Sequence, residues 1–192
     1  MALRPAGQPI DIETPRFRLR TLRAADASTR WQGWGKDPEI MGALNAPTRE
    51  LDVGYLAKYA ASFDSEHRHL VGIFEKAAGS HVGFFIVEIE RMHRCATFNV
   101  VIGDKGWWGK GVVNETRAAL LDHFFEQRGI EKAIGTPLGR NFPAVFNYKA
   151  QGWRHEATLR GHRVSVTDNS RLDQYQFGLL RDDWRKLRKA GP

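Results

Sequence analysis

Several features that would restrict this chain to a special class are scarce or missing. Its 192 residues contain one cysteine, Cys95, so an intrachain disulfide and a cysteine-based zinc site are both excluded within the chain. Apolar runs are only a few residues long, far below the roughly 20 residues that a membrane-spanning helix needs. The seven histidines are scattered, and only His67 and His69 could face the same way on a strand. We therefore assign no metal and expect no membrane partner.

The first residues likewise contain no apolar signal region, so we expect a cytoplasmic, unprocessed protein. Hydrophobic residues make up 42% of the sequence and charged residues 27%, which is typical of one folded domain at this length. Residues 1–14 carry Pro5 and Pro9 and show little periodicity, so we predict an N-terminal arm there. Residues 15–192 are predicted to form a single domain.

The formal net charge of +7 could serve nucleic acid, a membrane surface or a polyphosphate ligand. Basic residues are spread along the chain, and their two local concentrations, 16–23 and 181–189, alternate with apolar or acidic residues. Neither concentration contains a nucleic-acid-binding motif. We expect no specific nucleic-acid partner, and binding of ribosomal RNA ranks last among the functions considered.

Hydrophobic periodicity predicts strands and helices in both halves of the chain. Strands are expected over 15–22, 69–76, 81–90, 95–103, 132–136, 153–160 and 171–180. Two short helices are expected within 24–45, a third from Pro47, a fourth after Gly111 that ends at Gly129, and a short one at the C-terminus. For Trp31 and Trp34 we favour a place in the core over a place in a substrate pocket. The pattern predicts an α+β fold, with a meander joined to a parallel crossover.

The stretch from Phe98 to Gly129 organises the chain. An apolar strand, 98–102, passes through a turn with several glycines into an unbroken helical pattern. The first helical N–H groups have no partner within the helix and point outward, at the positive end of the helix dipole. Gly109 and Gly111 let the backbone approach a phosphate, and Lys110 adds positive charge. The turn therefore predicts an anion site.

Two well-known phosphate loops do not fit this turn. A nucleoside-triphosphate loop needs Ser or Thr after its Lys to hold magnesium, but here Gly111 follows Lys110. A dinucleotide loop needs G-x-G-x-x-G, and Asn114 stands where the third small residue belongs. Residues 102–112 (IGDKGWWGKGV) resemble instead the acetyl-coenzyme A loop of the GCN5-related N-acetyltransferases, especially the branch similar to ribosomal-protein N-terminal acetyltransferases.

A second segment, from Asn141 to Trp153, is similar to that family's pattern N-x-x-A-x-x-x-Y-x-x-x-G-F, with Trp153 at the aromatic position. Asn141 can cap a helix through its side-chain oxygen, and Gly152 can close it. The resemblance implies that Asn141 hydrogen-bonds the pantetheine arm and that Tyr148 lies near the thioester sulfur. A phenol is protonated at neutral pH, so Tyr148 is our choice of general acid.

The resemblance covers about residues 15–190, and it implies a twisted, mostly antiparallel mixed sheet of about seven strands, flanked by helices on both faces. It also implies acetyl-coenzyme A as co-substrate. The residues expected to hold it are Val100, Val101, Ile102, Trp108, Gly109, Lys110, Gly111, Val112, Val113, Asn141 and Tyr148.

The expected function is direct transfer of an acetyl group to a primary amine, either a protein N-terminus or a small molecule such as an amino sugar, a polyamine or an antibiotic. Members of the branch often carry a glutamate in the strand before the loop, but here that strand has Thr97, Phe98 and Asn99. Glu88, on the preceding strand, is our candidate for the general base. The alternative is a coenzyme A-binding regulator without turnover. A homodimer is left open.

Overall fold

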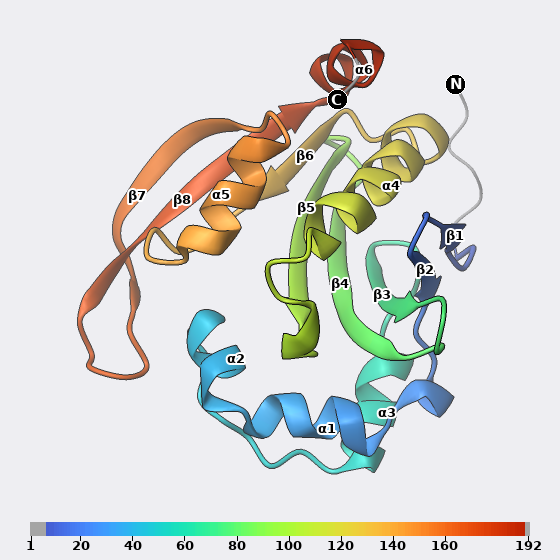
Figure 1. The fold of residues 1–192 in the computed structure, drawn as a ribbon. Coiled ribbons are helices and arrows are strands. Elements are labelled where there is room, and N and C mark those ends of the chain that lie inside the picture. Colours follow the sequence, from blue (N-terminus) through green and yellow to red (C-terminus); the bar gives the residue numbers. More distant parts are fainter. Residues whose placement is uncertain (1–6, 191–192) are drawn as a thin grey trace.

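One eight-stranded sheet runs through the computed structural model, which describes residues 7–190 (Figure 1). The strand order is β1-β2-β3-β4-β5-β6-β8-β7. Only β5 and β6 are parallel; every other neighbouring pair is antiparallel. The predicted mixed, mostly antiparallel fold is confirmed, with one strand more than the seven expected. The strands are β1 (Asp11–Glu13), β2 (Phe17–Thr21), β3 (Arg68–Glu75), β4 (His81–Glu90), β5 (Cys95–Ile102), β6 (Lys132–Gly135), β7 (Arg154–Val164) and β8 (Arg171–Leu180).

The additional strand, β1, lies within the segment that we expected to be an arm without periodic structure. Ile12 pairs with Leu19 of β2, and the neighbouring Ile10 is 2% exposed in the core. This part of the arm is therefore part of the sheet, because its apolar side chains are buried on folding. Residues 1–6 lie outside the described residues, and the division of the chain into an arm and one domain stays a prediction.

Capping side chains explain where the early helices begin. Asp37 Oδ1 accepts the N–H of Glu39 at 2.9 Å, and Pro38 supplies a first helical residue that needs no N–H partner, so one helix ends and the next begins there. The third helix begins at Val53, later than the predicted Pro47, because Asp52 caps it. The helices are α1 (Thr29–Lys36), α2 (Pro38–Ala43), α3 (Val53–Ala61), α4 (Val112–Gln127), α5 (Phe142–Ala150) and α6 (Arg181–Ala190), with short 3₁₀ turns η1 (Ala24–Asp26) and η2 (Lys105–Trp107). None of the helices in the described residues is both long and apolar enough to cross a membrane.

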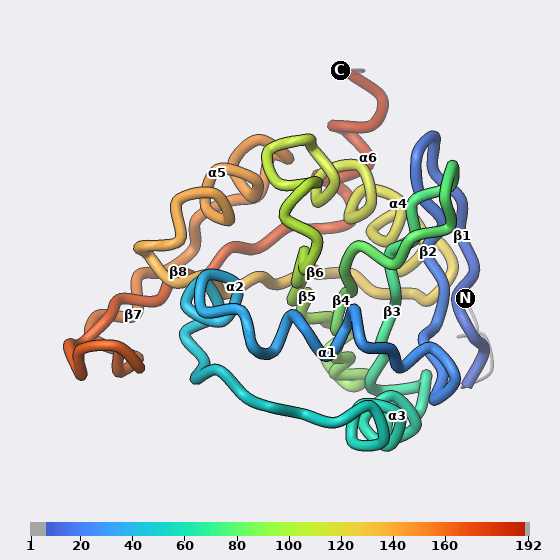
Figure 2. Tube along the Cα trace, turned by 60° about the horizontal axis from the view of Figure 1, so that its bottom comes forward, coloured from blue at the N-terminus to red at the C-terminus, as the bar shows by residue number. Residues whose placement is uncertain are grey.

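The helices cover the two faces of the sheet in two groups. Figure 2 shows α1, α2 and α3 on one side of the strands and α4, α5 and α6 on the other. Successive residues of β4 point to opposite faces, so Phe84 packs in the cluster under α1–α3 and Phe85 in the cluster under α4–α6. Trp31 and Trp34 are 5% and 7% exposed in the first of these clusters, which confirms their predicted place in the core.

The feature that matters most for function is where β5 and β6 separate. They pair only over Cys95–Thr97 and Lys132–Ile134. Beyond Thr97 and Ile134 the two strands diverge (Figure 1), and we call this point the fork. Helix α4 connects the two strands across the sheet. Backbone groups of β5 beyond the fork are therefore not paired with β6.

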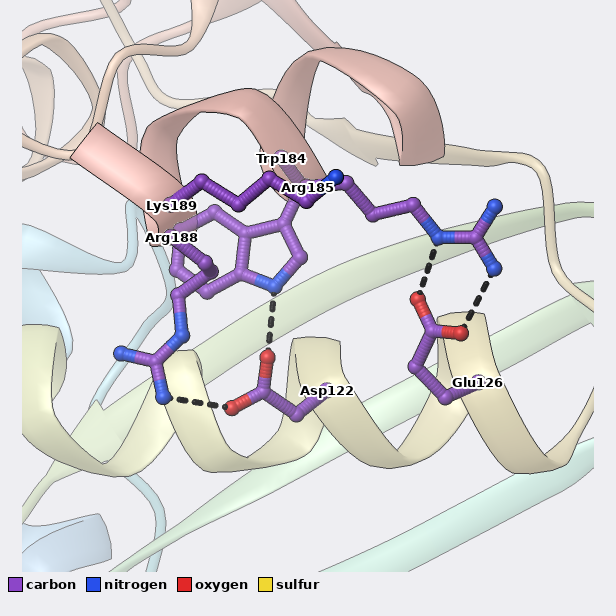
Figure 3. A pocket seen from close by; sticks show the side chains of 6 residues that line it. All are labelled: Asp122, Glu126, Trp184, Arg185, Arg188 and Lys189. Carbon is purple, nitrogen blue, oxygen red and sulfur yellow. Dashed lines mark hydrogen bonds and ion pairs between the residues drawn. The ribbon is translucent and has the colours of Figure 1, made fainter. Parts of the chain in front are cut away.

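A groove of about 480 Å³ lies between α4 and α6 (Figure 3). Both of its carboxylates are paired with arginines of α6. Asp122 accepts from the indole Nε1 of Trp184 at 2.8 Å and pairs with Arg188 at 3.1 Å, while Glu126 pairs with Arg185 at 2.6 Å. The groove contains none of the predicted site residues, and these contacts fix α6 against α4.

Candidate functional site

The glycine turn between β5 and α4 has the backbone geometry that the sequence predicted. Gly109 and Gly111 both have φ of +72°, a left-handed conformation that other residues adopt at a cost. Gly111 is the N-cap of α4 and offers no side-chain cap. A side chain at Gly109 would point into open space, with nothing within 4 Å. The start of α4 is thus left uncovered.

This arrangement fits the diphosphate of acetyl-coenzyme A. The first turn of α4 presents the N–H groups of Val112 and Val113, which have no partner within the helix. The helix dipole adds a partial positive charge at this end. Lys110 is exposed beside the turn, with its Nζ 5.5 Å from the ring centroid of Trp107. The roles of these residues in binding stay predictions.

A side-chain network that we did not predict holds the turn against the N-terminal part of the sheet. Glu115, in the first turn of α4, accepts from Arg16 Nε at 2.7 Å and from Thr14 Oγ1 at 2.7 Å. Arg16 Nη2 also donates to the carbonyl of Lys110 at 2.9 Å. Arg16 therefore adds a second cation beside Gly111. Nothing in the sequence pattern singled it out, since it belongs to an alternating basic strand.

The edge of β5 beyond the fork presents alternate backbone groups. The carbonyls of Phe98 and Ile102 accept hydrogen bonds from the side chains of Tyr148 at 3.2 Å and Trp108 at 2.8 Å, so they face away from β4. Because backbone direction alternates along a strand, Val100 faces the same way. We expected Val101 to bind the cofactor too. The Val101 backbone oxygen lies on the side of β4, where a methyl group added to Gly83 would come within 2.3 Å of it, and the role of Val101 stays a prediction.

Asn141 caps α5, as predicted. Its Oδ1 accepts the N–H of Ala144 at 3.2 Å, and its amide nitrogen donates to the carbonyl of Ala43, at the end of α2, at 3.2 Å. The side chain therefore joins α5 to the helices of the opposite face. Gly152, with φ of +77°, follows the helix, which agrees with its predicted closing role. Contact of Asn141 with pantetheine stays a prediction.

Tyr148 projects from α5 to the fork. Its ring stacks on Phe177 at an interplanar angle of 9° and meets Trp153 edge-on, and the residue is 5% exposed. Its hydroxyl donates to the carbonyl of Phe98, which is the first β5 residue beyond the last β5–β6 pair. Burial raises the pKa of the Tyr148 phenol, so the hydroxyl is protonated at neutral pH. Its catalytic role stays a prediction.

Two carboxylates flank the fork on the opposite face, under α1–α3. Glu88 lies directly across from Thr97, the last β5 residue paired with β6, and its side chain is 51% exposed beside Arg68 at 3.5 Å. It shares this face with Ile86, which packs in the α1–α3 cluster. The sequence correctly placed Glu88 beside the strand that leads to the loop, and its role as base stays a prediction.

The second carboxylate, Glu156, was missed. The β7–β8 register shifts between His155 and Ala157, so Glu156 is an extra residue in a β-bulge, which redirects its side chain. The carboxylate lies over Gly178, where an added methyl group would come within 2.2 Å of it, and it pairs with Lys132 at 2.8 Å. Burial raises the pKa of Glu156, but the hydrogen bonds from Lys132 and Gln176 and the charge of Lys132 together outweigh it, so the pKa is lowered overall.

Arg117, on α4, was also missed. It is 1% exposed, and its guanidinium carbon lies 4.2 Å from the ring centroid of Tyr148. The sequence held one signal for it. Position 117 follows Val113 by four residues and precedes Leu120 by three, so a cation stands on the apolar stripe of the helix.

Similar folds occur among solved acetyltransferases. Spermidine N-acetyltransferase from Vibrio cholerae, solved with CoA and spermine, has a TM-score of 0.78 and 19% identity over 88% of this chain and 98% of that chain. Ribosomal-protein-S5-alanine acetyltransferase from Vibrio fischeri has a TM-score of 0.78 and 14% identity over 91% and 98%. A GCN5-related N-acetyltransferase from Brucella melitensis has a TM-score of 0.80 and 16% identity over 99% and 87%.

No curated protein sequence matches the chain. A family model does: the acetyltransferase (GNAT) domain matches residues 16–152, which contain both the glycine turn and the segment from Asn141 to Gly152. The matched region is well over half of the 192 residues. The chain therefore belongs to the GNAT family of N-acetyltransferases, which take their acetyl group from acetyl-coenzyme A.

Proposed function

We propose that this protein transfers an acetyl group directly from acetyl-coenzyme A to a primary amine, with the two substrates approaching the fork from opposite faces. One observation carries the proposal. The fork opens beside the left-handed turn at Gly109 and Gly111. Where the two strands separate, the phenol of Tyr148 lies on the α4–α6 face and the carboxylate of Glu88 lies on the α1–α3 face. In this arrangement the cofactor binds between α4 and α5.

Different residues would bind the diphosphate and the pantetheine arm of acetyl-coenzyme A. The N–H groups at the start of α4, with Lys110 and Arg16 beside them, would hold the diphosphate. The outward backbone of Val100 would bind the pantetheine arm. Acetyl-coenzyme A supplies an acetyl thioester, whose carbon is the electrophile.

Proton transfers at the two ends of the fork complete the reaction. The amine must first lose a proton, since an ammonium has no lone pair, and Glu88 accepts it directly or through water. The N–C bond then forms and the C–S bond breaks. The sulfur leaves with the electron pair of that bond and takes the phenolic proton of Tyr148. The nitrogen then loses its second proton to solvent, and solvent returns a proton to the Tyr148 phenolate, so free thiol and amide are the products.

For the acceptor we propose two amines to test first. The similar V. cholerae structure was solved with spermine, and the similar V. fischeri protein is described as acting on the alanine of ribosomal protein S5. Here Glu88 and Glu156 place two carboxylates on the acceptor face, which suits a cationic amine of either kind.

The test is release of free thiol from acetyl-coenzyme A in the presence of spermidine, a peptide with N-terminal alanine, an amino sugar and an aminoglycoside. Thiol release that depends on one of these amines supports the proposal. The second candidate is a coenzyme A-binding regulator, favoured by the absence of a carboxylate at Thr97, Phe98 and Asn99 and by the bond that already engages the Tyr148 hydroxyl. Binding of acetyl-coenzyme A without thiol release by any amine would favour the regulator.

A further inference from the structure

Arg117 is a buried cation without an acidic partner. It lies in the second turn of α4, is 1% exposed, and is the largest of the fully buried side chains. Within residues 7–190 no carboxylate lies within ion-pair distance of its guanidinium. Burial lowers the pKa of Arg117 to about 10, so the group still carries its charge at pH 7.

Arg117 donates hydrogen bonds to neutral groups at the C-terminal end of α5. Its Nε donates to the side-chain oxygen of Gln151, and its Nη2 donates to the carbonyl of Asn147 at 2.9 Å. Gln151 in turn donates to the carbonyl of Asn114, in the first turn of α4, at 2.6 Å. These bonds fix the orientation of the guanidinium but leave its charge uncompensated.

The guanidinium lies over two aromatic rings, of which that of Tyr148 is nearer. The guanidinium carbon lies 4.2 Å from the ring centroid of Tyr148 and 5.3 Å from that of Trp153. The other face of the Tyr148 ring is occupied by Phe177, so the phenol is held between a cation and an apolar ring. At low dielectric, a full charge at this distance acts strongly on any negative charge that forms on the phenol oxygen.

An isolated buried charge is costly, and an apolar side chain of similar size would usually pack there at lower cost. Packing alone therefore does not account for an arginine at this position. From this geometry we infer that Arg117 is a positioning residue for the proposed acetyl transfer: it fixes the Tyr148 ring at the fork and stabilises the negative charge on its oxygen as the phenolic proton passes to the leaving sulfur. This inference rests on the proposed function.

Burial and the charge of Arg117 act in opposite directions on the pKa of Tyr148, which agrees with this role. Burial raises the pKa of Tyr148, whereas the charge of Arg117 lowers it. Without the charge, the phenol would be a weaker acid and would give up its proton less readily. The same cation would also favour a thiolate that forms close to the ring.

The test measures the phenol itself, apart from turnover. With 3,5-difluorotyrosine at position 148, the phenol titrates at lower pH and its ionisation is followed by absorbance. Arg117→Met removes the charge, and Gln151→Glu keeps Arg117 but compensates its charge. Both should raise the titration midpoint by about one pH unit or more, a tenfold change in ionisation. Gln151→Met, which removes the hydrogen bonds of Gln151 without adding charge, is the matched control and should leave the midpoint nearly unchanged.

Turnover supplies the second readout. Arg117→Met should lower kcat by about tenfold or more with little change in KM for acetyl-coenzyme A, and Arg117→Lys should restore most of the rate. If the titration midpoint of the phenol moves in neither Arg117→Met nor Gln151→Glu, the inference is overturned, whatever happens to the rate. An unsubstituted protein that binds acetyl-coenzyme A but transfers to no amine overturns the proposed function instead, so the two failures are distinguishable.

Discussion

Tyr148 is a core residue whose hydroxyl lies at the proposed site of acetyl transfer. Its ring is buried between Arg117 and Phe177, yet its hydroxyl reaches the carbonyl of Phe98 at the fork. A hydroxyl that donates to a backbone carbonyl can exchange that acceptor for another without moving the ring, since only the O–H direction changes. The environment thus fixes the ring and leaves the proton free to be redirected.

We expect Tyr148→Phe to lower kcat by about 100-fold, a typical contribution of general acid catalysis, with less than about a threefold change in affinity for acetyl-coenzyme A. The phenyl ring keeps the packing against Phe177, but the carbonyl of Phe98 loses its donor, which costs about 1 kcal/mol of unfolding free energy. Steady-state kinetics and calorimetry measure the two parameters separately. An unchanged kcat would remove Tyr148 from the mechanism.

Glu88→Gln is expected to slow transfer by about tenfold or more at pH 7, because the amide cannot accept the amine proton. Glu90→Gln is the matched control. Glu90 lies on the same strand face but opposite Cys95, farther from the fork, so its substitution should leave the rate unchanged. Equal rates in both variants would assign the proton to another group, such as Glu156, which lies on the same face over Gly178.

Among single residues, those that form a turn or a helix cap could be predicted from the sequence. Residues whose position depends on tertiary packing could not. Gly109, Gly111 and Asn141 have the expected conformations because a turn or a cap is decided by local chemistry. Glu156 was missed because a β-bulge cannot be deduced from alternation, and Arg16 because its partner, Glu115, is 99 residues away in the sequence.

The glycine turn and α4 act as one element, since the turn determines which N–H groups α4 presents. Gly111→Val should weaken acetyl-coenzyme A binding by about tenfold or more, because a β-branched residue is strained at φ of +72° and its side chain would occupy the phosphate approach. Apart from its chain neighbours and the backbone of α4, only Arg16 among residues 7–190 lies within 4 Å of the added carbon, so there is room for the side chain itself.

Gly79→Val supplies the control for that strain. Gly79 has φ of +67° in the turn between β3 and β4, also with open space around it, and it is remote from α4. Its substitution should cost similar stability in thermal unfolding without weakening the cofactor. If isothermal calorimetry finds the same affinity in both variants, the anion site does not lie at Gly111.

Element types and order were predictable because the periodicity of each segment matched its final environment. Helix boundaries near α3 were not, since Asp52 rather than Pro47 provides the cap. Strand β1 could not be predicted from the sequence, because its three residues, 11–13, are too few to show alternation and pairing with β2 decides their conformation. The separation of β5 from β6 is a property of the whole sheet that no local pattern encodes.

The whole molecule is a sheet between two apolar clusters, and each cluster contains a buried histidine. His69 packs edge-on to Phe124, and His81 stacks on Phe74 between Trp31 and Trp34. Neither ring nitrogen of either histidine has a hydrogen-bond partner within residues 7–190. Burial lowers the pKa of each to about 4.

These histidines predict acid sensitivity of the fold. Between pH 6.5 and about 4 the unfolded chain binds protons that the folded protein does not, so stability falls as the pH is lowered through this window. Between pH 7 and pH 4.5 each histidine should contribute about 2 kcal/mol of the loss. Urea unfolding at pH 7 and pH 4.5 measures it. His81→Phe, which keeps a ring on Phe74, should lose less stability than the unsubstituted protein; an equal loss would contradict the assignment.

Binding of acetyl-coenzyme A at the start of α4 is the central claim for the whole molecule. Isothermal titration calorimetry of the purified protein with acetyl-coenzyme A, repeated on Gly111→Val and Gly79→Val, tests this directly. We predict one site per chain, with affinity lost in the first variant and kept in the second. Absence of binding heat and of thermal stabilisation in the unsubstituted protein would contradict the central claim.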